Sequence, residues 1–394
     1  MLKKLPIISS SAGFGDIISS MRSQKGLCVS SKFREALSVA TGVTNIYLTN
    51  SGISAFYLIL KAISKLSPKK EIVLSAYTAG SLIVAIRKAG LKPVLCDISL
   101  DDFNMDTGAV MNVLSDNTLA VLAIHMFGIG SRGLGTLRAN LPRGAFLIED
   151  CCQAMGSIVD GSAVGASGDV SFFSYNRGKN LPLCGGGSIA TGDVFIAKAI
   201  EDQMREIPEI SFFGKLTNGL RSLAFTLFTN PYLYGLAYPL ASRFREDAPP
   251  GDIEARKMGD FTAALGTRLI EMMEEFARKR YDNGLYLLKG LKVLDGITLP
   301  EIPEGFRPAF NRMPILFKDL ERRQLAKERL SESGIEASRM YLRPLHHMFE
   351  LGYGVLEFPN ACYLAEHLLT LPVYPELKKK VLDRIIRIIS GAVK

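Results

Sequence analysis

Short apolar runs alternate with helix-patterned segments through the first half of the chain. The runs have the length of buried strands, and the segments between them carry apolar residues on one helical face. This alternation predicts an α/β fold with a mostly parallel sheet covered on both faces. The predicted strands are 45–48, 71–74, 93–96, 119–124, 146–148, 170–173 and 188–190, and the predicted helices are 54–66, 81–89 and 107–114.

The pattern changes in the second half of the chain. Residues 261–281 read as one long helix, and a smaller α/β region follows, ending in a helix over 377–389. We therefore expect a large domain over 1–205, an apolar connector over 206–255 and a small C-terminal α/β domain over 256–394.

No charged residue occurs between Arg221 and Arg243. The length of this segment, 222–242, would allow a membrane span, but Asn230-Pro231 and two further helix-breaking residues argue against one regular spanning helix. Its tyrosines suit a segment that lies at a membrane interface. Three interpretations stay open: a buried helical hairpin or subunit contact, an interfacial membrane contact, and a span.

Composition excludes several other classes of protein. The chain has 394 residues, of which 47% are hydrophobic and 22% charged, as is typical of folded globular proteins. The six cysteines show no CxxC spacing, and the four histidines do not combine with them at zinc spacing, so we expect reduced thiols and no metal site. The N-terminus does not resemble a signal peptide, which favours a cytoplasmic location.

The net charge of +8 is spread along the chain rather than gathered with aromatic residues on one element. A nucleic-acid partner is therefore not expected. An anionic small substrate, or peripheral contact with the anionic inner face of a membrane, fits this basic balance better.

Candidate chemistry centres on Lys179. Ser174 precedes it by five residues, and Asp150 follows an apolar run 29 residues before it. An acid, a hydroxyl and a lysine in this order are what an enzyme needs to hold pyridoxal phosphate (PLP). The acid keeps the pyridine nitrogen protonated, the hydroxyl helps to hold the phosphate, and the lysine forms the Schiff base. Asp150 could instead cap a helix.

A second candidate is the turn 50–54, which connects a predicted strand to a helix. Gly52 would let the backbone approach a phosphate, and Ile53 and Ser54 lie where a helix N-terminus offers free N–H groups. Ser54 could also simply cap that helix. Gln153, three residues after Asp150, is placed to reach the cofactor ring or its phenolic oxygen.

Taken together, these motifs resemble those of the DegT/DnrJ/EryC1/StrS family of sugar aminotransferases over nearly the whole chain. The matching segments are 50–55 for the phosphate turn S-G-T-x-A, 92–98 for K-P-V-F-V-D-I, 125–128 for H-L-Y-G, 148–154 for I-E-D-x-A-Q-A, 179–181 for K-N-L and 371–375 for L-P-x-x-P.

The resemblance implies a fold type I PLP-transferase with a seven-stranded sheet, active as a homodimer with shared active sites. It implies Lys179 as the Schiff-base lysine, Asp150 on the pyridine nitrogen, Gln153 near the phenolic oxygen and Ser174 on the phosphate. The usual reaction moves an amino group from glutamate to a keto-sugar carried on a nucleotide. Some relatives are dehydratases that lack the lysine, so Lys179 favours the transaminase.

Several positions depart from the family pattern. Ile53 replaces a threonine, and Ala79 stands where an aromatic residue usually stacks on the cofactor, which leaves Tyr77 as a substitute. The partner-subunit motif N-Y-R-M aligns with 255–258, where Lys257 or Arg256 could serve the phosphate.

These departures leave the acceptor open between a nucleotide-linked and a lipid-linked keto-sugar. The hypothesis is a PLP-dependent, glutamate-using aminotransferase of amino-sugar or cell-surface polysaccharide biosynthesis. The alternatives are another PLP reaction on the same fold, such as a dehydration or a condensation, and a membrane-associated homologue without activity.

Overall fold

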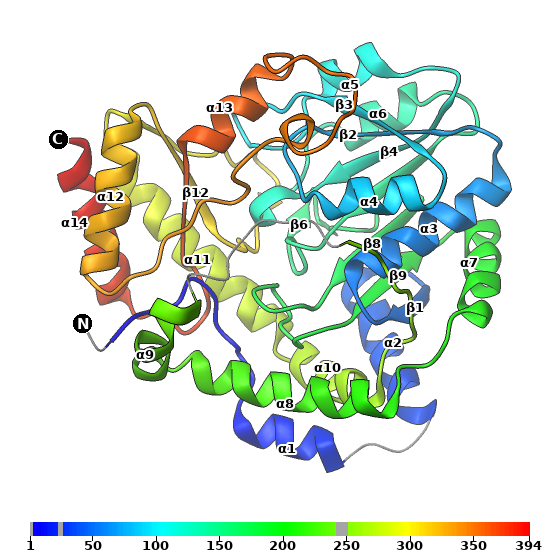
Figure 1. Cartoon of the computed structure of the whole chain (residues 1–394), viewed down its shortest axis with the longest axis horizontal. Coiled ribbons are helices and arrows are strands. Elements are labelled where there is room, and N and C mark those ends of the chain that lie inside the picture. The colour runs from blue at the N-terminus through cyan, green and yellow to red at the C-terminus, as the bar shows by residue number, and fades with distance from the viewer. Residues whose placement is uncertain (1–2, 23–26, 242–250) are drawn as a thin grey trace.

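The computed structural model describes residues 3–22, 27–241 and 251–394 and is built around one seven-stranded sheet (Figure 1). The strands lie in the order β1-β9-β8-β5-β4-β2-β3. All neighbours pair in parallel except β9, which runs antiparallel to both β1 and β8. The predicted strands are thus all confirmed, as β1 (Asn45–Thr49), β2 (Glu71–Ser75), β3 (Lys92–Cys96), β4 (Thr118–Ile124), β5 (Phe146–Asp150), β8 (Val170–Ser174) and β9 (Gly187–Thr191).

Helices cover both faces of the sheet because successive strand residues point to opposite sides. Ile72 and Leu74 pack with α3 (Gly52–Leu66), α4 (Ser81–Lys88) and α7 (Val194–Glu206) on one face. The intervening Val73 packs on the other face, where α5 (Thr107–Val113) and α6 (Leu134–Asn140) lie. Further along that second face, α2 (Leu27–Thr41) covers β1, and α1 (Phe14–Arg22) contributes to the same core.

The single long helix predicted over 261–281 is wrong. The chain forms α10 (Asp260–Ile270) and α11 (Met273–Leu291), with a break between them. Phe261 and Leu269 of α10 are buried in the large-domain core, whereas Leu287 and Leu291 of α11 are buried in a separate core. The helix ends because the chain must turn from one core to the other, a change that the apolar periodicity does not reveal.

The second core belongs to a smaller C-terminal region. Its antiparallel sheet has the order β10-β12-β13, formed by Ile297–Thr298, Met313–Phe317 and Leu368–Leu371. Helices α11, α12 (Leu320–Glu332) and α14 (Lys379–Val393) pack with this sheet, and α13 (Pro359–His367) precedes β13. A third small sheet joins β11 (Phe306–Arg307) to β6 (Ile158–Val159) and β7 (Ser162–Ala163). The domain limits given above stay a prediction, and the packing of α10 favours a boundary near α11.

The connector forms two helices, α8 (Phe212–Phe228) and α9 (Pro231–Ala241), while residues 242–250 lie outside the described part of the chain. Tyr234 is buried and its hydroxyl donates to Glu336 Oε2 at 2.7 Å, which fixes α9 to the small domain. Leu233 and Leu236 are exposed. Across the described ranges, no helix has the length and apolarity needed to cross a membrane. The segment is therefore a half-buried helical pair.

Candidate active site

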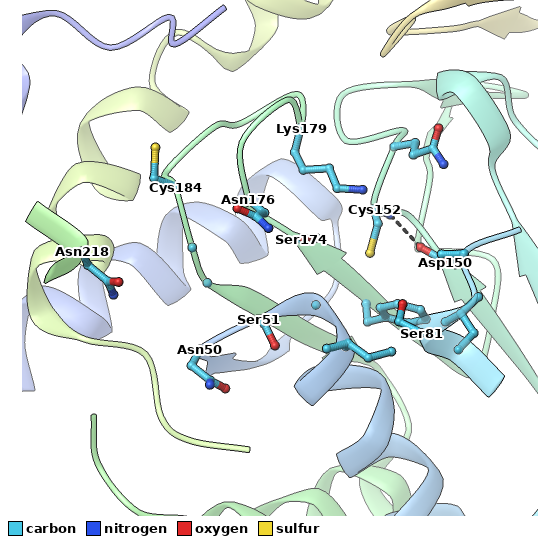
Figure 2. Close-up of a pocket in the computed structure, with 18 of the residues that line it drawn as sticks. Asn50, Ser51, Ser81, Asp150, Cys152, Ser174, Asn176, Lys179, Cys184 and Asn218 are labelled. Carbon is cyan, nitrogen blue, oxygen red and sulfur yellow. Dashed lines mark hydrogen bonds between the residues drawn. The ribbon is translucent and has the colours of Figure 1, made fainter. Parts of the chain in front are cut away.

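A cavity of about 540 Å³ opens at the carboxyl ends of the central strands (Figure 2). In parallel α/β sheets this is the edge at which ligands bind. The end of β5, the turn after β8, the starts of α3 and α4, and one side of α8 all contribute to its wall. The predicted site residues that line it are Gly52, Ile53, Asp150, Gln153, Ser174 and Lys179.

Lys179 lies on the turn that follows β8, and its side chain extends towards the strand end that carries Asp150 (Figure 2). The turn is held rigidly from behind. Asn180 Nδ2 donates to Met155 O at 2.9 Å and to Ala309 O at 2.7 Å. Within the described ranges, no hydrogen bond or ion pair occupies Lys179 Nζ, so the amine is available for chemistry.

Asp150 ends β5 and is 8% exposed. Its Oδ1 accepts a hydrogen bond from the backbone N–H of Cys152 at 2.9 Å. Burial raises the pKa of the Asp150 carboxyl above its ordinary value, more than this hydrogen bond and the nearby Lys179 lower it. A buried carboxylate of this kind is stabilised by a cationic hydrogen-bond donor, and a protonated pyridine nitrogen is such a donor.

The turn before α3 approaches Ser174 very closely. A Cβ on Gly52 would lie 2.7 Å from Ser174 Cβ and 3.2 Å from Cys152 Sγ, so only glycine fits there. Ser51 caps α3, accepting from the backbone N–H of Ser54 at 3.2 Å. The free N–H groups of the first helical turn therefore face the same cavity as the hydroxyls of Ser51 and Ser174.

Ser54 does not line the cavity. Its side chain is buried beneath the turn, where its hydroxyl lies 2.8 Å from Ser51 Oγ. Ser51, which was not among the predicted site residues, lines the cavity instead.

Tyr77 also lies outside the cavity wall. Its ring is fully buried, and its hydroxyl donates to the backbone carbonyl groups of Met340 and Tyr341. Because this ring belongs to the core beneath the site, the structure gives no support for stacking on the cofactor. Tyr341 lines the cavity instead and contacts Tyr77 edge-on, with ring centroids 5.7 Å apart. No local pattern in the sequence marks Tyr341.

Lys257 does not line the cavity either. Its Nζ forms an ion pair with Glu209 Oε1 at 3.1 Å, on the surface of the protein. The backbone just before it does reach the phosphate turn, since the N–H of Arg256 donates to Asn50 Oδ1 at 3.0 Å. Within one chain, then, this segment supports the turn rather than supplying a cation to it.

Gln153 lies on the floor of the cavity. Its Oε1 accepts from the backbone N–H of Phe127 at 3.1 Å, and its Nε2 lies 3.4 Å from the hydroxyl of Tyr341. These contacts fix the amide with its Nε2 on the side of Tyr341, where it can donate to an acceptor in the cavity.

A buried network supports β5 from below. His125 Nδ1 accepts from the N–H of Ser131, so Nε2 carries the proton and donates to Glu149 Oε2 at 2.9 Å. Burial alone would raise the pKa of Glu149, but the hydrogen bonds from His125 and the backbone N–H groups of Gly165 and Gly168 outweigh it and lower that pKa. The network fixes the strand end on which Asp150 stands.

The wall opposite α3 comes from the connector. Thr217, Asn218 and Arg221 of α8 line the cavity, and Asn218 is seen at its edge in Figure 2. In the sequence, Arg221 is notable only as the residue at which the uncharged segment begins. Its position as the last charge before that segment was the one available signal for a cation close to the site.

These residues fit PLP. Gly52 leaves a cradle that any side chain would fill, the α3 N-terminus and two hydroxyls suit a phosphate, and Asp150 suits a protonated ring nitrogen. Lys179 stands on the same cavity with an amine that no described residue holds.

Comparison with known proteins agrees with this geometry. The profile of the DegT/DnrJ/EryC1/StrS aminotransferase family matches residues 16–390. The chain is 26% identical over 352 residues to UDP-N-acetyl-3-dehydro-alpha-D-glucosamine 3-aminotransferase of Acidithiobacillus ferrooxidans, covering 86% of this chain and 82% of that protein. It is 25% identical over 358 residues to dTDP-3-amino-3,4,6-trideoxy-alpha-D-glucose transaminase of Micromonospora megalomicea subsp. nigra, covering 89% and 86%.

Among solved structures, the fold is similar to that of S. venezuelae DesV, determined in complex with a ketimine intermediate. The TM-score is 0.80 at 21% identity, over 100% of this chain and 99% of that one. Helicobacter pylori PseC, an aminotransferase of pseudoaminic acid biosynthesis, gives a TM-score of 0.79 at 18% identity, over 99% of both chains. The chain belongs to the DegT/DnrJ/EryC1/StrS family of PLP-dependent aminotransferases.

Proposed function

We propose that this protein transfers an amino group from glutamate to a keto-sugar carried on a diphosphate, in the synthesis of an amino sugar for a cell-surface polysaccharide. The observation that carries the proposal is the convergence of Lys179, Asp150 and Ser174 on one cavity, in a chain of this family. A homologue that had lost its activity would not need to retain all three in place.

The cofactor supplies an electron sink that makes the Cα proton of the amino donor acidic. Asp150 contributes by holding the ring nitrogen in its protonated form, because a buried carboxylate strongly favours a cationic neighbour. The rigid end of β5 and the Cys152 N–H group keep its carboxylate aimed at one point of the cavity.

The phosphate end is held by the chain around Gly52. The hydroxyls of Ser51 and Ser174 and the free N–H groups at the start of α3 supply hydrogen bonds and the positive end of a helix dipole. Ile53 replaces a hydroxyl donor with an apolar side chain, so the hydroxyls on this side of the cavity are those of Ser51 and Ser174.

Lys179 has two roles. Its amine would hold the cofactor covalently, and in its free form the same group would take up the proton from Cα of the donor. The hydrogen bonds of Asn180 fix the turn, so the amine returns to the same place in each half of the reaction.

The acceptor enters over α8. Arg221 lies on the cavity wall and offers a planar guanidinium for a diphosphate, which nucleotide-linked and lipid-linked sugars share. Relatives named for UDP- and dTDP-linked sugars favour the nucleotide carrier.

The proposal includes a homodimer with shared active sites, in which the partner subunit supplies a phosphate-binding cation such as Lys257. The exposed position of that lysine, away from the cavity of its own chain, supports this arrangement.

It also places the enzyme in the cytoplasm with peripheral contact at the inner face of the membrane. Exposed apolar residues gather on α1, α8 and α9: Phe14, Ile18, Leu220, Leu227, Phe228, Tyr232, Leu233 and Leu236. A second cavity, of about 570 Å³, opens beside the start of α9 and is lined by four basic side chains and one carboxylate, Glu376; the basic residues are Lys3, Lys378, Lys380 and Arg384. Apolar side chains next to cations suit an anionic membrane surface.

The test is to supply purified, PLP-loaded protein with glutamate and measure 2-oxoglutarate. Without an acceptor, about one equivalent per active site is expected, because the amino group stays on the enzyme. Adding a UDP-linked keto-sugar should give continued release and an aminated sugar. Loss of water from the sugar without any release of 2-oxoglutarate would instead support the dehydratase alternative.

A further inference from the structure

Two groups of three metal-ligating side chains occur among the described residues outside the catalytic set. The first, His125 with Glu149 and Cys151, is fully buried, and its histidine and glutamate are already satisfied by the network beneath β5. It leaves no donor atoms free for an ion.

The second group has no such explanation. His346 and His347 end the short helical turn Leu345–His347, and Cys362 lies on α13. Cys362 Sγ lies 3.7 Å from His346 Nε2 and 3.8 Å from His347 Nε2, and the ligand atoms of all three residues lie within 4.8 Å of one another. All three residues are half-buried.

A backbone oxygen completes the group. The carbonyl of Val355 lies 3.2 Å from His346 Nε2, 2.8 Å from His347 Nε2 and 3.7 Å from Cys362 Sγ. Without a metal, two imidazole N–H groups and a thiol would converge on this one acceptor. If a metal ion is bound, the three side chains are deprotonated ligands, which explains why their nitrogen and sulfur atoms lie so close to one another and to the Val355 carbonyl.

The spacing matches a tetrahedral ion. Zinc–nitrogen bonds of about 2.0 Å and zinc–sulfur bonds of about 2.3 Å place the ligand atoms of a tetrahedral site about 3.3 to 3.6 Å apart. The separations of Cys362 Sγ from both Nε2 atoms and from Val355 O, 3.7 to 3.8 Å, and that of His346 Nε2 from Val355 O, 3.2 Å, lie close to that range, whereas His347 Nε2 lies closer to Val355 O, at 2.8 Å. Thiolate and imidazole ligands select zinc over the hard cations magnesium and calcium.

We propose that His346, His347 and Cys362 bind one zinc ion, with the carbonyl oxygen of Val355 at the fourth corner. The site lies apart from the cofactor cavity, and none of its ligands lines that cavity. This proposal departs from the sequence-based expectation of no metal site. That expectation relied on spacing along the chain, and two adjacent histidines followed by a cysteine 15 residues later match no recognised metal-binding pattern.

The ion would clamp the segment that joins α12 to α13. That segment packs over α4 and β3, where Arg87 donates to Glu350 O at 2.7 Å and Tyr353 accepts from the N–H of Leu95 at 2.9 Å. Tyr341, at its start, lines the cofactor cavity. Zinc therefore fixes a wall of the active site from outside, as a structural ion.

The test uses full-length, PLP-loaded protein without a histidine tag. After dialysis against a chelator, zinc is titrated in competition with a chromogenic chelator, and cobalt(II) is then substituted for zinc. We expect one zinc per chain, a rise in the melting temperature on zinc addition, and a thiolate-to-cobalt charge-transfer band. Cys362→Ser and His347→Leu should each weaken zinc binding at least tenfold and remove the stabilisation by zinc, and Cys362→Ser should also remove the charge-transfer band.

Cys28→Ser is the matched control, because Cys28 is an exposed free thiol outside the cluster. It should bind zinc and cobalt like the unaltered protein. The proposal is overturned if the unaltered protein binds no zinc, or if Cys362→Ser and His347→Leu bind it as tightly as Cys28→Ser does. Melting temperatures in chelator show whether each variant is folded, so a loss of binding is not confused with a loss of structure.

Discussion

Gly52 and Ser174 lie so close together that a methyl group on the glycine would approach the Cβ of the serine to 2.7 Å. One residue starts α3 and the other ends β8, so this contact joins the helix N-terminus to the strand end that leads to Lys179. The phosphate-binding groups and the catalytic amine are thereby held in one fixed arrangement.

Gly52→Ala should therefore lower the affinity for PLP at least tenfold and destabilise the protein by about 1–3 kcal/mol through overpacking. PLP titration and urea unfolding measure the two effects. Gly135→Ala is the control, because a Cβ on Gly135 meets no atom within 4 Å and α6 should tolerate alanine well. Unchanged PLP affinity in Gly52→Ala would contradict the close approach at the phosphate.

Asp150→Asn should stabilise the cofactor-free protein at neutral pH. Burial raises the pKa of this carboxyl above the ordinary value of 3.8, so the folded state binds more protons than the unfolded state between 3.8 and the raised pKa. Stability is then lost as the pH rises through that window, and asparagine avoids the loss while it keeps the hydrogen bond from Cys152.

Urea unfolding of both cofactor-free proteins across pH checks this. The advantage of the variant should shrink as the pH falls towards 3.8, and PLP should stabilise the unaltered protein more than the variant. If the asparagine variant is less stable than the unaltered protein at every pH, burial is not the dominant influence on the pKa of the Asp150 carboxyl.

Arg221→Gln should raise KM for the diphosphate-linked acceptor by about 10- to 100-fold, as expected for the loss of one charge-assisted hydrogen-bonded contact. The half-reaction with glutamate should be unaffected, because glutamate carries no diphosphate. Arg278→Gln, which removes an exposed arginine paired with Asp282, serves as the control. Equal losses in both half-reactions would assign Arg221 to the structure of α8 instead.

Replacing Leu233 and Leu236 together by glutamate should abolish binding to vesicles that contain phosphatidylglycerol. These side chains are 42% and 69% exposed, and the new charges oppose both burial and the anionic lipid. Co-sedimentation with anionic and zwitterionic vesicles measures the effect. The matched control replaces Val194 and Phe195, which are exposed on α7, by glutamate in the same way.

A different outcome would reassign the apolar surface of α9. If the unaltered protein does not bind vesicles and the Leu233/Leu236 variant changes from dimer to monomer in light scattering, this surface is a subunit contact. That result would favour the first of the interpretations drawn from the sequence.

The sheet could be predicted because each of its strands is a short apolar run between polar turns, so local pattern and tertiary position agree. The positions of Asp150, Ser174 and Lys179 at the edge of the sheet could be predicted as well, because each is fixed by the strand that it ends or follows. The helix break at 271–272 was missed because it depends on two separate cores.

Residues placed by tertiary folding escaped the sequence analysis. Tyr77 was predicted to stack on the cofactor in place of an aromatic residue at position 79, but its ring packs in the core, and Tyr341 from the distant C-terminal region lines the cavity. Arg221 reaches the wall only because α8 folds back over the site. Such contacts depend on how elements meet, which no local spacing records.

The most direct test of the account is the absorption spectrum of the PLP-loaded protein before and after addition of glutamate, in unaltered and Lys179→Ala forms. Lysine-bound PLP absorbs at roughly 410–430 nm, and glutamate should shift this band towards about 330 nm. Lys179→Ala should lack the lysine-bound band and turn over no acceptor, whereas the exposed-lysine control Lys289→Ala should behave like the unaltered protein. A lysine-bound band that persists in Lys179→Ala would contradict the assignment of the catalytic lysine.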